Sequence, residues 1–85
     1  MLIKTYTYKV ELNSGTQKTF YDIQDALSFC VMLGYHSHYR CDDGRTFIYR
    51  DDQERDADTN GGGERGAIEE IEEIEEIFCD AEHTL

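Results

Sequence analysis

The chain has 85 residues, which is enough for one small domain with a limited hydrophobic core. Its 19 acidic and 8 basic side chains give a formal charge of -11, and its three cysteines are an odd number at irregular spacing, which implies no disulfide framework. A chain this acidic is repelled by nucleic acid and by anionic membranes, and it is attracted to basic protein surfaces. We therefore expect no direct binding of nucleic acid and no membrane binding.

The sequence has no stretch with the apolar length that secretion or membrane insertion requires. The first residues lack the sustained apolar run of a signal peptide, and nothing later approaches the roughly 18 apolar residues of a membrane span. Cysteines without a disulfide framework suit a reducing compartment. We expect a cytoplasmic protein.

The first third of the chain predicts two strands and a helix. Residues 2–12 alternate apolar and polar side chains with period two, which predicts a strand, and residues 17–20 predict a short antiparallel strand after a turn. Residues 22–33 change to the periodicity of an amphipathic helix. Asp22 is suited to cap its N-terminus and Gly34 to end it in a left-handed conformation.

A second hairpin is predicted after the helix. Residues 35–41 alternate, residues 46–50 run back, and Asp42-Asp43-Gly44 supplies the turn between them. Residues 1–50 therefore predict an α+β body of order ββαββ, a four-stranded antiparallel sheet with one packed helix.

The rest of the chain predicts a linker and an acidic helix. Residues 51–66 contain one alanine and no larger apolar side chain, which is typical of a flexible linker. Residues 67–80 repeat Ile-Glu-Glu three times and predict a helix, so that residues 67–85 form an acidic C-terminal helix and tail. A repeat of three does not match 3.6 residues per turn, so the isoleucines would wind around this helix.

The negative charge is concentrated in this second part. Residues 1–50 carry five acids and six bases, whereas residues 51–85 carry 14 acids and two bases. Rows of carboxylates on a rigid element can replace nucleic-acid phosphates on a basic protein, and such binding would be driven by counterion release. The carboxylates expected to bind the partner are Glu69, Glu70, Glu72, Glu73, Glu75, Glu76 and Asp80, extended by Asp51, Asp52 and Glu54 of the linker.

A small α+β body with this dense carboxylate array resembles the phage-encoded inhibitors that mimic DNA, such as anti-CRISPR and anti-restriction proteins. The resemblance is one of class, carried by residues 51–58 and 69–76. It implies a basic, nucleic-acid-binding partner: a host defence or DNA-handling protein, such as a CRISPR effector, whose DNA groove is occupied. The protein would then act in the cytoplasm of the host cell.

The alternative is a structural or assembly module, in which the glutamates are only the solvated side of the helix. In that case its apolar residues dock on the protein's own sheet or on a second copy, which leaves a homodimer open. These residues are Ile68, Ile71, Ile74, Ile77 and Phe78. Affinity that falls steeply with ionic strength would favour charge mimicry over apolar docking.

Residue types used in catalysis and metal binding occur in arrangements that do not suit either. Cys30 lies in the core stripe of its helix, and Gly61-Gly62-Gly63 lacks the strand and the lysine of a phosphate-binding loop. Zinc-ligand types are present at His36, His38, Cys41, Cys79 and His83. On a regular strand, however, Cys41 would point away from the first two histidines. We expect no enzyme activity, no cofactor and no metal site.

Overall fold

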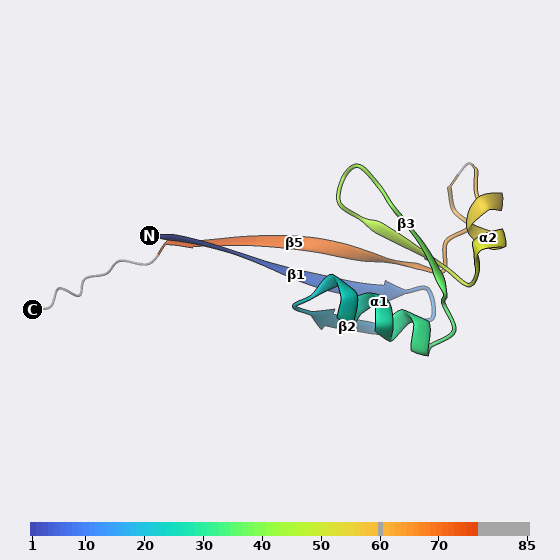
Figure 1. Cartoon of the computed structure of the whole chain (residues 1–85), viewed down its shortest axis with the longest axis horizontal. Helices are drawn as coiled ribbons and strands as arrows, with labels where there is room; N and C mark the ends of the chain where they lie inside the picture. The colour runs from blue at the N-terminus through green and yellow to red at the C-terminus, as the bar shows by residue number, and fades with distance from the viewer. Residues whose placement is uncertain (60, 77–85) are drawn as a thin grey trace, which may run out of the picture.

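The computed structural model describes residues 1–59 and 61–76. Its elements are β1 (Leu2–Leu12), β2 (Gln17–Phe20), α1 (Ile23–Met32), β3 (Ser37–Arg40), β4 (Thr46–Tyr49), α2 (Asp52–Ala57) and β5 (Gly66–Glu76). The described strands form one antiparallel sheet of order β2-β1-β5-β4-β3 (Figure 1). The α+β class and the order of the first five elements, ββαββ, are confirmed, but the sheet has five strands and not four.

The predicted ends of α1 are confirmed by their backbone geometry. Asp22 caps the N-terminus, where its carboxylate accepts a hydrogen bond of 2.7 Å from the backbone N–H of Gln24. Gly34 follows the helix with a φ of 97°, a conformation in which a β-carbon would be strained. The short turn that glycine permits sends the chain directly into the second hairpin.

The prediction of an acidic helix over residues 67–80 is wrong for residues 67–76, which lie in strand β5. This strand pairs with β1 along its whole length, from Leu2 opposite Glu76 to Leu12 opposite Gly66. In a helix, glutamates three and four residues apart lie about 5–6 Å from each other and repel. In a strand, consecutive glutamates point to opposite faces, and β-branched isoleucine packs well on a pleated surface. Residues 77–85 lie outside the described residues.

The prediction of a flexible linker over residues 51–66 is also wrong in part, because residues 52–57 form α2. Asp51 caps this helix and accepts a hydrogen bond of 2.8 Å from the backbone N–H of Glu54. Beyond the helix, the hydroxyl of Tyr49 donates to a carboxylate oxygen of Asp58 at 2.7 Å. Local capping and this contact to the sheet thus stabilise a segment that has few apolar side chains.

The core lies between α1 and one face of the sheet. It consists of Val10, Leu12, Ala26, Cys30, Ile48 and Ile68. Ile68 comes from β5, which runs between β1 and β4, so the central strand of the sheet lies outside the body predicted for residues 1–50. The start of β5 is closely packed: a β-carbon on Gly66 would lie 2.5 Å from the backbone oxygen of Glu11.

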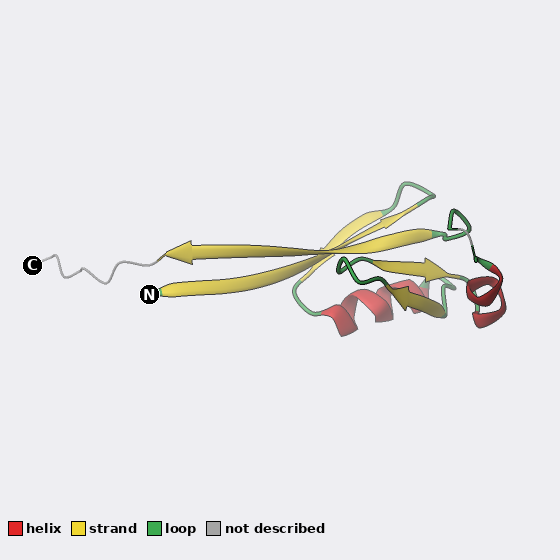
Figure 2. Cartoon of the chain, turned by 90° about the horizontal axis from the view of Figure 1, so that it is seen from above, coloured by secondary structure: helices red, strands yellow, loops and turns green. Residues whose placement is uncertain are grey.

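Strands β1 and β5 extend well beyond the rest of the sheet (Figure 2). β2 pairs with β1 only from Tyr8 to Glu11, and β4 pairs with β5 only from Gly66 to Ile68. Residues 2–7 of β1 and 71–76 of β5 therefore form a two-stranded projection, which we call the ribbon. It leaves the body at the end opposite α2 (Figure 1).

Candidate partner-binding surface

The six glutamates of β5 are divided between the two faces of the sheet. Ile68 lies in the core under α1, so the residues at even positions of this strand share the face that α1 covers, which we call the α1 face. This face carries Glu70, Glu72 and Glu76. The opposite face carries Glu69, Glu73 and Glu75.

Two glutamates of the α1 face already have cations beside them. Arg40 Nη2 lies 3.5 Å from Glu70 Oε1, and Lys4 Nζ lies 3.1 Å from Glu72 Oε2. The hydroxyl of Tyr8 also donates a hydrogen bond to Glu70 at 3.4 Å. The pKa of Tyr8 is raised, mainly by burial and to a lesser extent by the nearby carboxylate of Glu70. The hydrogen bond to Glu72 raises the pKa of Lys4, so the ammonium of Lys4 is charged at neutral pH.

The other four glutamates have no cation beside them among the described residues. Glu69 lies opposite Lys9 on β1, but the ammonium of Lys9 pairs with Glu11 at 3.6 Å. All four side chains are exposed. We call Glu69, Glu73, Glu75 and Glu76 the unpaired quartet.

The six glutamates of β5, counted over both faces of the strand, have a spacing close to that of the charges on a nucleic-acid strand. An antiparallel strand rises about 3.4 Å per residue, so Glu69 to Glu76 span roughly 24 Å. Six carboxylates over that length give about one charge per 4 Å, against one per 3.4 Å along a single strand of B-DNA. The structure thus presents a charge density comparable to that of phosphates, on a strand instead of the expected helix.

The linker acids do not extend this array. Asp51 caps α2, Asp52 lies 3.5 Å from Arg55, and Glu54 binds Arg65 at 2.7 Å. The hydrogen bond from Arg65, more than any other contact, lowers the pKa of Glu54 to about 2. All three lie near α2, at the end of the sheet away from the ribbon (Figure 1), so their carboxylates hold the local fold together. Asp80 lies outside the described residues.

The ribbon has an apolar cluster that the sequence analysis did not assign to a site. On the α1 face, Leu2 is 69% exposed, Ile74 is 60% exposed and Tyr6 is 39% exposed. Ile74 lies opposite Lys4 and is therefore diagonal to both other residues. The period-two alternation that placed Leu2 and Tyr6 on one face was a signal for this cluster, but the position of Ile74 required the register of β5.

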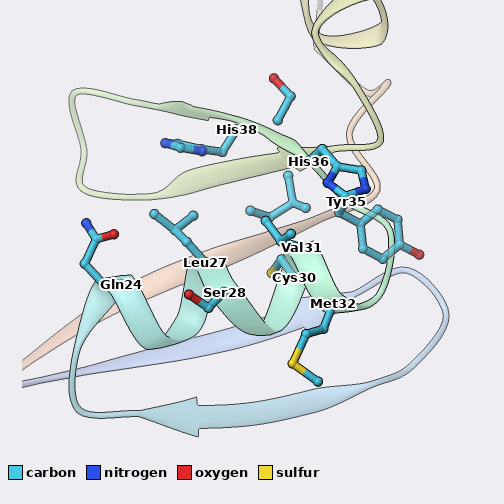
Figure 3. A pocket seen from close by; sticks show the side chains of 11 residues that line it. Gln24, Leu27, Ser28, Cys30, Val31, Met32, Tyr35, His36 and His38 are labelled. Carbon is cyan, nitrogen blue, oxygen red and sulfur yellow. The ribbon is translucent and has the colours of Figure 1, made fainter.

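A groove of about 480 Å³ lies between α1 and the second hairpin (Figure 3). Leu27, Cys30 and Val31 line it from the helix, while His36 and His38 line it from the other side. Burial raises the pKa of Cys30 to about 11, so at neutral pH this cysteine is a thiol and not the thiolate that nucleophilic catalysis uses. Among residues 1–59 and 61–76, no group of three or more histidine, cysteine, aspartate or glutamate side chains is placed to hold a metal ion.

Comparisons of the chain with protein-family models, curated proteins and solved structures found no match. In the described part of the chain, no helix is long and apolar enough to cross a membrane. The assignment of function therefore depends on the surfaces of the molecule itself.

Proposed function

We propose that this protein binds a basic, nucleic-acid-binding protein and occupies its nucleic-acid groove with the carboxylates of β5. It would thereby inhibit a host defence or DNA-handling protein, such as a CRISPR effector. The observation that supports this proposal is the unpaired quartet, whose four exposed carboxylates lie along one strand over roughly 24 Å, about one charge per 6 Å.

The unpaired quartet is suited to this role because binding would break no internal ion pair. Glu70 and Glu72 must share or release Arg40 and Lys4 before they contact a partner's cation. Glu73 and Glu75 have no such competitor among the described residues. A charge-assisted hydrogen bond contributes about 1.5–3 kcal/mol where it forms, so four contacts from the quartet would contribute about 6–12 kcal/mol before the entropic cost of association is subtracted.

The ribbon also explains how the carboxylates would reach into a groove. It projects from the body as two strands, while the helices remain at the body (Figure 2). A two-stranded β-ribbon fits into the major groove of B-DNA, which is about 12 Å wide. A whole B-DNA duplex is wider than its own major groove, so a protein cleft that admits a duplex is wide enough for this element.

The test compares two variants that each lose four negative charges. In the first, glutamine replaces the unpaired quartet; in the control, asparagine replaces four exposed aspartates away from the ribbon: Asp25, Asp42, Asp52 and Asp56. Proteins captured by the immobilised full chain at low salt are loaded with a labelled DNA duplex, and displacement of the duplex by each variant is measured.

We expect the parent and the aspartate control to displace the duplex and the glutamine variant to fail. Direct binding of the captured proteins to the parent should weaken steeply as salt is raised, because counterion release drives it. The proposal is wrong if the captured proteins keep their DNA in the presence of the parent chain, or if both variants lose the same affinity. The second result would mean that net charge, and not the position of the carboxylates, decides binding.

A further inference from the structure

The ribbon leaves one edge of β1 without a neighbouring strand in the described chain. β2 pairs with β1 from Tyr8 to Glu11 only, so residues 2–7 have β5 on one side and no strand on the other. A sheet edge of this kind presents a row of unpaired backbone donors and acceptors to any second strand.

Two hydrogen bonds at the far end of β1 show which residues face this open edge. The N–H of Leu12 donates to the oxygen of Thr16, on the side of β2, and the N–H of Asn13 donates to the oxygen of Arg65, on the side of β5. Successive residues of a strand alternate in direction. The backbone groups of Leu2, Lys4 and Tyr6 therefore point out of the open edge, while those of Thr5 point toward β5.

The two open edges of the ribbon differ in charge. The edge of β5 carries Glu72 and Glu76, and charged side chains are a common protection against pairing between edges. Over residues 2–7, the edge of β1 has one charge, on Lys4, which Glu72 of the neighbouring strand already neutralises at 3.1 Å. It has neither a proline nor a second charge that would prevent pairing.

The apolar cluster of Leu2, Tyr6 and Ile74 lies beside this same edge. A two-stranded ribbon is at best marginally stable in water, and three or more strands are normally needed. An added strand along β1 would give the ribbon three strands and would cover part of the apolar cluster.

We infer that β1 pairs antiparallel with β1 of a second copy of this chain, across a two-fold axis at Lys4. In this register Leu2 lies opposite Tyr6 of the other copy, and each of the three facing pairs forms two hydrogen bonds. The result is a continuous four-stranded sheet, β5-β1-β1-β5, with apolar pairs on either side of the axis. The inference does not depend on the proposed function.

Electrostatics favour pairing through two β1 edges over pairing through two β5 edges. The axis sets Lys4 opposite Lys4 of the other copy, but each ammonium already has Glu72 of its own chain 3.1 Å away. Pairing two β5 edges would place rows of glutamates beside each other. Pairing through β1 places the two β5 strands on the outer edges, about 14 Å apart at a strand spacing of about 4.8 Å. That separation exceeds the Debye length of about 8 Å at physiological ionic strength, so the acidic strands repel each other weakly.

The first test is the mass of the full chain by sedimentation equilibrium over a concentration series. We expect a dimer for the parent and a monomer for Lys4→Pro, because proline removes the outward N–H and leaves the hydrogen bonds to β5 in place. Lys4→Thr is the matched control: it loses the same charge but keeps the N–H, and it should remain a dimer. A monomeric parent, or a Lys4→Pro variant as dimeric as Lys4→Thr, would overturn the inference.

The second test holds even if Lys4→Pro does not fold. It uses Lys4→Cys in a chain whose Cys41 and Cys79 are replaced by serine. Facing residues of a hydrogen-bonded pair have Cα atoms about 5.5 Å apart, within the range of a disulfide. Mild oxidation should link Lys4→Cys chains into dimers. Thr5→Cys chains should stay unlinked, because that position lies on the other face and is not opposite itself. Equal linking of the two would contradict the proposed register.

Discussion

Replacing Ile68 with alanine should remove a large part of the stability of this protein, whereas the same change at Ile74 should have little effect. Both residues belong to the Ile-Glu-Glu repeat, to strand β5 and to its α1 face. Ile68 is 1% exposed and packs in the core with Val10 and Ile48, while Ile74 is 60% exposed on the ribbon. Truncating a buried isoleucine to alanine costs about 2–5 kcal/mol, through lost burial and the cavity left behind.

The expected difference in stability between the two variants follows from burial alone, since both replace isoleucine with alanine on the same face of the same strand. We expect Ile68→Ala to lower the free energy of unfolding by about 3 kcal/mol. This is a major share of the roughly 4–13 kcal/mol available to a chain of this length. Ile74→Ala should change it by about 0.5 kcal/mol or less, as is usual for surface positions.

The assay is urea denaturation followed by circular dichroism, at the lowest protein concentration that gives a signal, so that association does not contribute. The midpoint should fall for Ile68→Ala with an unchanged slope, which would show that stability changed and not the compactness of the unfolded state. Equal effects at the two positions would refute the reasoning, because they would mean that β5 does not contribute Ile68 to the core.

Two further predictions test the assembly of the sheet and its electrostatics. A chain ending at Arg50 should give no cooperative unfolding transition by circular dichroism, because it lacks the central strand β5; a native-like spectrum would contradict this. The carboxyl of Glu54 has a pKa of about 2, below its ordinary value of 4.5. Its contacts with Arg65 therefore stabilise the folded protein fully above pH 4.5, and this stability is lost as the pH falls from about 4.5 toward 2. Thermal melts of Glu54→Gln should therefore show a shallower loss of stability over that interval than melts of the parent, and parallel curves would show that this group does not contribute.

Much of the fold is encoded locally and was predictable. The alternation of residues 2–12, the aspartate cap at Asp22 and the glycine turn at Gly34 act over a few residues, and each appears in the structure where the pattern placed it. The concentration of charge after residue 50 was also visible in the sequence. These features need no knowledge of distant partners.

The conformation of residues 67–76 was decided by a distant partner. A repeat of period three fits neither a helix nor a strand, so local preference could not choose between them. β1 has eleven residues and β2 pairs with only four of them, so a strand of this length needs a second partner, and β5 supplies it along the other edge of β1. That mismatch was the available signal for β5, and it depended on comparing the lengths of two strands.

The division of the glutamates into paired and unpaired could come only from the tertiary structure. Glu70 and Glu72 have cations because the register of β5 brings them to Arg40 and Lys4, 30 and 68 residues away in the sequence. A shift of one residue would move every side chain of β5 to the other face and change all of these pairs. The sequence by itself determined that this part of the chain is strongly acidic. Which carboxylates remain available to a partner was decided by the hydrogen bonds between β1 and β5, because those bonds set the register.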